Sequence, residues 1–368
     1  MSRTHSESGF SLIELLVATG ILLVISGIVT NALIQITNHQ KTVWNRTEMH
    51  SGIRGATELL QQEVGQAGRV TLPQNDVNTM NGWITLTQAV AVSASATPCT
   101  PIAVAPFWSG GAILPVTVSS TAGMWADVQY GIKLVIIDGD PPPGSPTGNS
   151  TEIVTVQTIP VSGQITACFS RSHVAGKKIM ALGGFAEGII GPSPAYSIGG
   201  VTGTYVNGSD KNHLKLFGDI NGDGNLVYIE YVCDNGSIPG VTNPSHNLYR
   251  NVMPFTQVGK PALDDSKILI SNIYPNDPDT DGSERPCFKY QWGSASGLQY
   301  VLDVAITLTV QTQQADATTK QFQRETKALL NVSPRNVFDV WSMVGYGETA
   351  RVQYTPPSVT ALLPNGTP

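Results

Sequence analysis

Oxygen-bearing side chains alternate in one short segment, Asp219-Ile220-Asn221-Gly222-Asp223-Gly224-Asn225. Glu230 occupies the position of the final acid in the calcium-loop pattern D-x-[DN]-x-[DN]-G-x5-E. In such loops, oxygens at alternate positions converge on a hard cation, and the central glycine permits a sharp turn. The spacing therefore predicts Ca²⁺ as a possible cofactor, held by Asp219, Asn221, Asp223, the Asn225 carbonyl and Glu230.

The residues that flank this loop predict strands, not the helices of an EF-hand. His213–Phe217 and Leu226–Val232 are rich in apolar and β-branched residues, so a β-hairpin is the expected setting. On a straight strand, Glu230 would lie about 16 Å beyond Asn225, out of reach of the same ion. A plain hairpin turn is the alternative, because Asn-Gly and Asp-Gly are the usual turn dipeptides.

A single carboxylate, Glu14, lies near the start of a long apolar run. From Phe10 to Ile36 no other residue is charged. As a helix, this run would be about 40 Å long, more than the ~30 Å hydrocarbon core of a bilayer. A charge inside a membrane helix is costly and usually functional. Glu14 either extends into the headgroups at the membrane edge or has a function within the apolar segment.

The elements that must position these residues begin with one long helix. Beyond Ile36 the chain becomes polar, and apolar residues then recur at spacings of three and four: Met49, Ile53, Ala56, Leu60, Val64 and Ala67. This spacing predicts that the helix continues to about Gly68 with one apolar face. Residues 10–36 would lie in a membrane or filament core, and residues 37–68 would pack on a globular domain.

The region after Gly68 predicts strands. Runs rich in β-branched residues are bounded by Gly, Pro, Asp or Asn at Gly131–Ile137, Glu152–Ile159, Leu226–Val232, Lys267–Ile273 and Tyr300–Gln311. The pattern of Thr319–Leu330 fits a helix or a strand, and a strand is the preferred prediction. Residues 138–149 are expected to form a loop. The predicted fold class is α+β, with a long helix on a large antiparallel β domain at residues 69–345 and a flexible tail at 346–368.

The polar leader and the apolar junction resemble a known family. Met1–Gly9, followed by Phe10-Ser11-Leu12-Ile13-Glu14-Leu15, is similar to the leader and N-terminal motif of type IV pilins and type II secretion pseudopilins. The resemblance implies that residues 1–9 form a leader, and that prepilin peptidase cuts between Gly9 and Phe10 and methylates Phe10. It further implies that Glu14 pairs with the N-terminal amine of a neighbouring subunit during assembly.

A second resemblance covers the late strands. Cys287–Tyr290, Val301–Val310, Leu330 and Ser333–Val337 look like the closing segment of PilW-type minor pilins and J-type pseudopilins. The length of 368 residues, and an apolar run without proline, favour a minor subunit. The family implies a single-pass protein of the bacterial inner membrane, with its C-terminal domain outside the cytoplasm, that later reaches the pilus or cell surface. Other pilin subunits are its implied partners.

Four cysteines, Cys99, Cys168, Cys233 and Cys287, are far apart and include no CxxC pair. This spacing argues against a zinc site, whereas an exported domain makes one or two disulfides plausible. All three pairings remain open, as do four free buried thiols.

Catalysis and general nucleic-acid binding find little support. The chain has no HExxH, GxSxG or P-loop motif, so no enzyme activity is expected. A net charge of −6 argues against a general nucleic-acid surface.

The function expected first is a minor pilin of a type IV pilus. The alternatives are a type II secretion pseudopilin and a membrane-anchored adhesin or binding module exported by the prepilin route.

Overall fold

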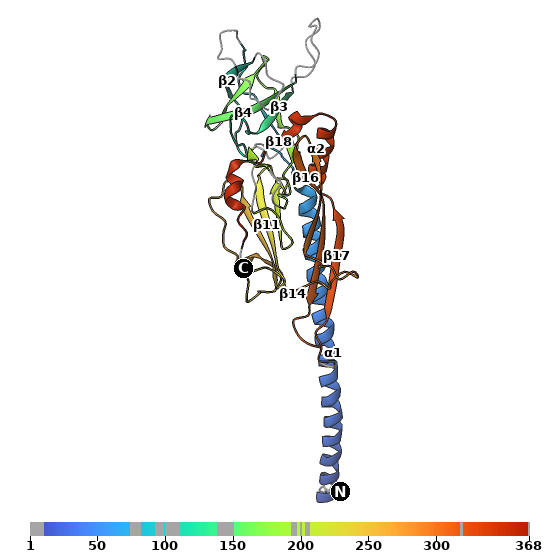
Figure 1. Cartoon of the computed structure of the whole chain (residues 1–368). Helices are drawn as coiled ribbons and strands as arrows, with labels where there is room; N and C mark the ends of the chain where they lie inside the picture. Colours follow the sequence, from blue (N-terminus) through green and yellow to red (C-terminus); the bar gives the residue numbers. More distant parts are fainter. Residues whose placement is uncertain are drawn as a thin grey trace, which may run out of the picture. The chain divides into compact units, whose positions relative to one another are not determined.

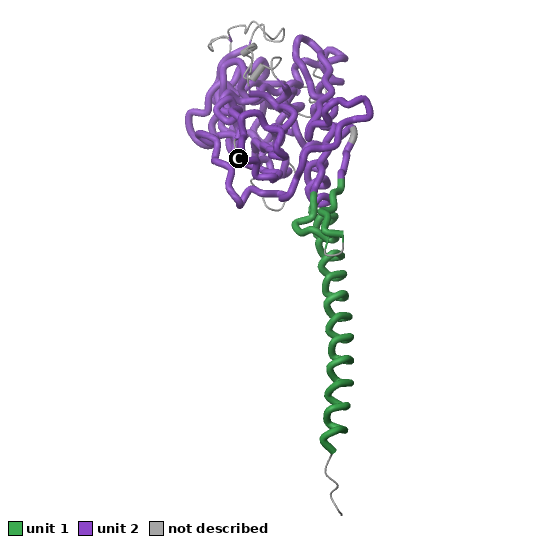
Figure 2. Tube along the Cα trace, turned by 60° about the horizontal axis from the view of Figure 1, so that its bottom comes forward, with its two compact units in different colours: residues 1–52, 311–325 green, residues 53–310, 326–368 purple. Residues whose placement is uncertain are grey.

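The computed structural model describes residues 11–73, 82–92, 99, 111–137, 151–192, 197–198, 201–202, 207–316 and 319–366. The chain divides into two compact units, Met1–Gly52 with Gln311–Glu325, and Ile53–Val310 with Thr326–Pro368 (Figure 2). The leader, residues 1–9, and the expected loop at 138–149 lie outside the described residues.

The predicted N-terminal helix is confirmed as α1, Leu12–Gln66 (Figure 1). Its predicted apolar face is buried, with exposed fractions of 7% or less at Met49, Ile53, Ala56, Leu60, Val64 and Ala67. Gly68 ends the segment with φ of +81°, a conformation that glycine adopts without steric cost.

The first sheet has six strands in the order β1-β6-β3-β4-β5-β2. Its neighbouring strands pair antiparallel, and its inward side chains form one large apolar core. The strands are β1 (Trp83–Thr85), β2 (Ala112–Thr117), β3 (Lys133–Ile137), β4 (Glu152–Val161), β5 (Gln164–Phe169) and β6 (Lys178–Ala181).

Two four-stranded sheets follow. The second sheet contains β10 (His213–Gly218), β11 (Val227–Asp234), β12 (Asn247–Pro254) and β13 (Ile268–Ser271). In the third sheet, β16 pairs with β14, β15 and β17, and the strands are β14 (Ile273–Tyr274), β15 (Phe288–Ala295), β16 (Leu298–Gln311) and β17 (Arg324–Val332). Short pairs join β7 (Gly184–Phe185) to β18 (Val352–Gln353) and β8 (Ser197–Ile198) to β9 (Val201–Thr202). The α+β pilin-like class is thus confirmed, as are the strands predicted around β3, β4, β11, β16 and β17. The strand predicted at Lys267–Ile273 is instead two strands in different sheets, β13 and β14, because the backbone turns at Asn272, where φ is +60°.

One helix lies within the β-rich region predicted at residues 69–345. The segment Arg335–Gly345 is helix α2, which follows Pro334. Val337, Val340 and Val344 recur at spacings of three and four and are buried together on one face. The helical period outweighed the strand preference of valine here, because the buried face follows the period.

The C-terminal segment also differs from its prediction as a flexible tail. The described part of 346–368 contains the short helices η2 (Thr349–Arg351) and η3 (Pro357–Leu362), in addition to η1 (Asp265–Lys267) earlier in the chain. Val359, Leu362 and Leu363 are at most 2% exposed and belong to the core of the first sheet. Burial of three large apolar side chains offsets the entropy of ordering a Pro- and Gly-containing segment.

Candidate assembly helix and calcium loop

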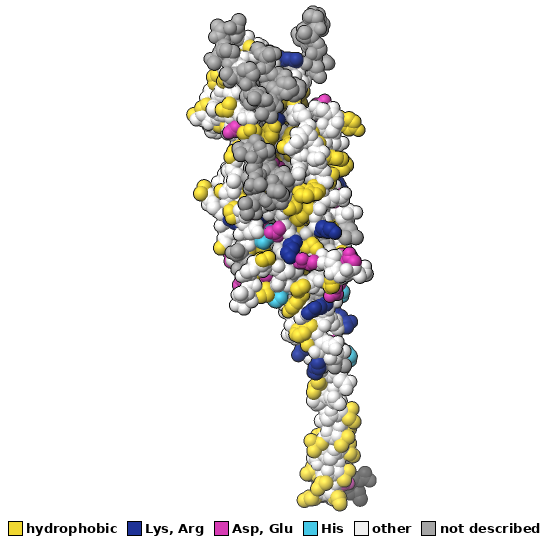
Figure 3. All heavy atoms as spheres, in the orientation of Figure 1, with side chains coloured by type: hydrophobic (Ala, Val, Ile, Leu, Met, Phe, Trp, Pro, Cys, Tyr) yellow, Lys and Arg dark blue, Asp and Glu magenta, His cyan; other side chains and the backbone are white. Residues whose placement is uncertain are grey.

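The first part of α1 exposes its apolar side chains. Every Leu, Ile and Val from Leu12 to Ile36 is at least half exposed, and Figure 3 shows hydrophobic side chains along this part of the helix. The most apolar window of α1 has a mean hydropathy of 2.5, so length and composition allow this helix to cross a membrane. Exposed apolar area of this extent requires a cover of lipid or protein.

Glu14 lies in the first turn of α1, at the beginning of the exposed apolar segment. Its Oε2 accepts a hydrogen bond of 3.0 Å from the backbone N–H of Ser11. The first N–H groups of a helix have no intrahelical partner, and a carboxylate placed there satisfies one of them. The predicted processing residues, Gly9 and Phe10, lie outside the described residues.

The second half of α1 is anchored in the β domain by a buried carboxylate. The side chain of Glu63 is 6% exposed and forms a salt bridge with Arg250 on β12. The hydroxyl of Tyr231 on β11 donates to Glu63 Oε2 at 2.5 Å. Burial, together with the charge of Glu63, raises the pKa of Tyr231, so the phenol keeps its proton and remains a donor. These contacts fix the rotation of the helix against the second sheet.

The C-terminal end of α1 is held by a side chain of α2. Asn336 Nδ2 lies 3.1 Å from the carbonyl oxygen of Gln66 and 3.4 Å from that of Ala67. These carbonyls lie at the C-terminal end of α1, where no further helical turn follows, and the Gln66 carbonyl also accepts from the N–H of Arg69 at 3.2 Å. Sequence reasoning missed both Glu63 and Asn336, because their partners are distant in the chain. For Glu63, the available signal was a charged residue beside Leu60 and Val64, on the predicted apolar face of the helix.

The predicted calcium loop is the connection between β10 and β11. Asp219 is buried, and its Oδ1 accepts a 3.1 Å hydrogen bond from the N–H of Gly224. Its Oδ2 accepts from the hydroxyl of Thr71 and lies 3.8 Å from Arg69 Nε. The loop's remaining predicted ligands, Asn221, Asp223 and Asn225, are exposed.

The loop glycines adopt the left-handed backbone conformation that a tight connection requires. Gly222 and Gly224 have φ of +76° and +83°. Across the described ranges, no group of three or more His, Cys, Asp or Glu side chains is placed to hold a metal ion. Calcium binding by the loop therefore stays a prediction.

Glu230 does not join the loop, which corrects its place in the predicted ligand set. It lies on β11 directly opposite Lys215 of β10. Its Oε2 is 2.8 Å from Lys260 Nζ, and its Oε1 is 3.8 Å from Lys215 Nζ. The physical reason is the extended backbone of β11, which carries the side chain away from the turn.

Comparison with known proteins bears on the N-terminal segment. Residues 4–30 match the family model described as the prokaryotic N-terminal methylation motif. The N-terminal segment is that of a type IV prepilin-like protein. No curated protein matches the chain, and no solved structure matches it.

The motif indicates how this prepilin-like protein is processed, exported and assembled. It implies processing by prepilin peptidase, export by the prepilin route and assembly with other pilins, as a pilin-like or pseudopilin protein. The motif and the exposed apolar helix fit anchoring in the inner membrane before assembly. The family that carries this motif is structural, not enzymatic.

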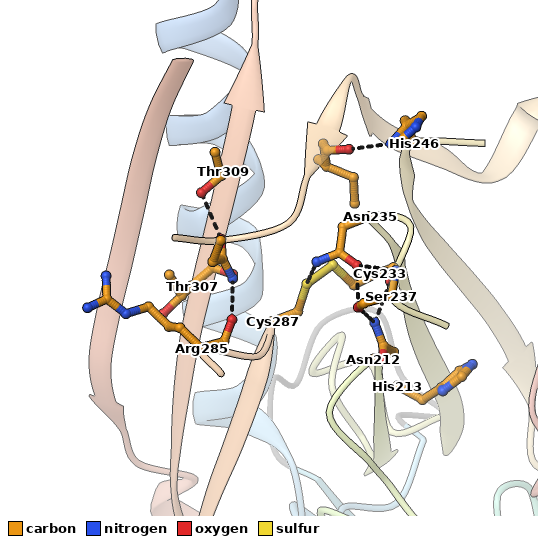
Figure 4. Close-up of a disulfide and its surroundings, with 12 residues drawn as sticks. Asn212, His213, Cys233, Asn235, Ser237, His246, Arg285, Cys287, Thr307 and Thr309 are labelled. Atoms are coloured by element: carbon orange, nitrogen blue, oxygen red, sulfur yellow. Dashed lines mark hydrogen bonds between the residues drawn. A yellow bond between two sulfur atoms is a disulfide. The ribbon is translucent and has the colours of Figure 1, made fainter. Parts of the chain in front are cut away.

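The four cysteines of the prepilin-like protein form two disulfides, Cys99–Cys168 and Cys233–Cys287. Figure 4 shows that Cys233–Cys287 joins β11 of the second sheet to the segment before β15 of the third sheet. Asn235 Nδ2 lies 3.5 Å from Cys287 Sγ, and Asn212 Nδ2 donates to the Cys233 carbonyl at 3.0 Å. The disulfide prediction is thereby confirmed, and the open question of pairing is answered.

Proposed function

We propose that this protein is a minor pilin, a structural subunit that enters or primes a type IV pilus through its N-terminal helix. One observation supports this most strongly: the methylation motif runs into a helix whose large apolar side chains are exposed from Leu12 to Ile36. A membrane covers these side chains before assembly. Neighbouring helices cover them in a filament, so the same surface serves both states.

Glu14 supplies the recognition step in this proposal. Cleavage after Gly9 creates an amine on Phe10, and Glu14 of one subunit pairs with the amine of another. Buried ion pairs contribute little net stability, but an unpaired charge in an apolar environment is costly. The pair therefore selects one register between neighbouring helices, because in other registers the Glu14 carboxylate would lie unpaired in an apolar environment.

Size and sequence favour a minor subunit over a major one. The chain has 368 residues, its apolar helix contains no proline, and Cys287–Tyr290 with the later strands resembles PilW-type minor pilins. In this proposal the leader faces the cytoplasm, and the β domain lies outside the inner membrane and then on the pilus or cell surface.

A type II secretion pseudopilin is the second candidate, because the same late strands also resemble J-type pseudopilins. Mechanical shearing of cells separates the candidates. Recovery of the protein in sheared filaments supports the minor pilin, and a short periplasmic filament supports the pseudopilin. Retention in the membrane after shearing supports an anchored adhesin or binding module instead.

The experiment that tests the role of Glu14 compares two single substitutions in the exposed part of α1. Glu14→Leu is expected to insert into the membrane as efficiently as wild type but to be absent from sheared filaments. Ile13→Leu, which preserves apolar character at the neighbouring position, is expected to assemble normally. Membrane and filament fractions are compared by immunoblot. Normal assembly of Glu14→Leu would rule out the pairing role.

A further inference from the structure

A lysine and a glutamate face each other in the β10–β11 hairpin and are both fully buried. Lys215 is paired in register with Glu230, and both side chains are 0% exposed. Lys215 Nζ lies 3.8 Å from Glu230 Oε1, while Lys260 Nζ lies 2.8 Å from Glu230 Oε2. Glu230 therefore lies between two lysines, and Lys260 is the nearer cation.

The C-terminal segment brings an amide to the same lysine. Lys215 Nζ donates to the side-chain carbonyl Oδ1 of Asn365 at 2.5 Å and to the backbone carbonyl of Leu363 at 2.6 Å. The N–H of Gly366 donates to both oxygens of Glu230 at 3.3 Å. A Cβ at Gly366 would lie 2.7 Å from Glu230 Oε2, so this approach requires glycine.

We propose that Lys215 and Asn365 become joined by an intramolecular isopeptide bond, with Glu230 as the proton carrier. The reaction is a transamidation between two side chains. Neutral Lys215 Nζ attacks Asn365 Cγ, and a new C–N bond forms. Glu230, whose Oε1 lies 3.8 Å from Nζ, accepts one proton from Nζ, and the departing Nδ2 of Asn365 takes up a proton in its place. The bond from Cγ to Nδ2 then breaks, ammonia leaves, and a secondary amide remains. The step requires no oxidant, metal or cofactor.

The distances suit this attack. A carbonyl bond is about 1.23 Å long, so Cγ of Asn365 lies at most about 3.7 Å from Lys215 Nζ, given the 2.5 Å contact with Oδ1. This is close to the separation of about 3 to 3.5 Å found in reactive conformations. Asp210 Oδ2 accepts from Asn365 Nδ2 at 3.2 Å, and this second contact orients the side-chain amide.

The environment also makes Lys215 a better nucleophile than an exposed lysine. Burial lowers the pKa of Lys215 to about 8, and the charge of Lys260 acts in the same direction. The charges of Glu230 and Asp210 raise this pKa, but they do not outweigh burial. About one molecule in ten would then hold a neutral amine at pH 7. One reaction per chain is sufficient, so a slow rate still leads to complete conversion.

The bond would tie the C-terminal segment to the centre of the second sheet. The segment 346–368 is otherwise held by apolar contacts of η3 and by hydrogen bonds. An amide bond between residues 215 and 365 makes its release impossible without proteolysis. This inference is independent of the proposed pilus role.

The test is mass spectrometry of the full-length protein purified from membranes in mild detergent. The expected result is an intact mass lower by one ammonia, and a branched tryptic peptide that links Lys215 to Asn365. Asn365→Ala alters an exposed residue and is expected to fold while losing both signals. Lys211→Arg changes an exposed lysine nearby and is expected to retain them.

Three outcomes would overturn the proposal. An unmodified intact mass would exclude the bond. Loss of ammonia without a branched peptide would indicate a succinimide at Asn365-Gly366 instead, and conversion of Asn365 to aspartate would indicate hydrolysis. Glu230→Gln adds a second measurement: if this variant folds and forms the branched peptide at the wild-type rate, the role of Glu230 as proton carrier is wrong.

Discussion

Glu14 and Glu63 are carboxylates on the same helix with opposite surroundings. Glu63 is enclosed by Tyr231 and Arg250, and these contacts meet its need for donors. Glu14 accepts a hydrogen bond from the N–H of Ser11, and the apolar side chains of this part of the helix are exposed. One residue type therefore serves internal packing in the first case and, in our proposal, recognition between subunits in the second.

Lys133 on β3 leads to a prediction about pH. Burial lowers its pKa to about 8, from an ordinary value of 10.5. Between these values the unfolded chain binds the proton that the folded chain has released, so the contribution of Lys133 to stability increases as pH rises from about 8 to 10.5. The slope is at most about 1.4 kcal/mol per pH unit.

The measurement compares wild type with Lys133→Met by urea unfolding of the full chain in mild detergent at several pH values. The free energy of unfolding of wild type minus that of the variant is expected to rise with pH above 8. A difference that is flat or falls with pH would contradict a lowered pKa at Lys133. Titration of other groups cancels in the subtraction, because both proteins contain them.

Calcium binding at the β10–β11 loop is tested by thermal unfolding with and without Ca²⁺. A bound ion at 100 times its dissociation constant stabilises the folded state by about 2.7 kcal/mol. Asp223→Ala should abolish this stabilisation, whereas Asp281→Ala, in another exposed acidic loop, should preserve it. If Ca²⁺ leaves wild type unchanged, the loop is a plain hairpin turn.

At the scale of elements, α1 depends on the β domain for its second half. We expect Arg250→Met to destabilise the protein by about 3 kcal/mol, because Glu63 would remain buried without its cation. The free energy of unfolding from urea titration gives the comparison.

Arg54→Met is the matched control for this change. Arg54 lies on the same helix and pairs with Glu58, but both side chains are at least 70% exposed. Its loss should change stability by less than about 0.5 kcal/mol. Equal effects of the two substitutions would show that the Glu63 contact is not an anchor.

For the whole molecule, the disulfide Cys233–Cys287 links two sheets that share no strand. Replacement of both cysteines by alanine is expected to cost about 2 to 5 kcal/mol, because the unfolded chain regains conformational freedom. The double substitution avoids a free thiol. Unfolding midpoints under non-reducing conditions give the result, and a change below about 0.5 kcal/mol would mean that packing alone holds the two sheets together.

Local patterns were sufficient for several features. The spacing of Met49, Ile53 and Leu60 predicted the buried face of α1, since helical periodicity is a property of neighbouring residues. The strand patterns at Glu152–Ile159 and Tyr300–Gln311 were also correct. The prediction failed in the C-terminal segment, where composition suggested a flexible tail but distant apolar partners decided the structure.

The sequence by itself determined the methylation motif, the long helix and the presence of a β domain, because each depends on residues close together in the chain. Only the tertiary structure decided the pairing of the four cysteines, the position of Glu230 opposite Lys215 and not in the loop, and the contact of Asn365 with that lysine. These depend on residues separated by up to 150 positions. Their proximity results from the packing of whole elements, which no local spacing records.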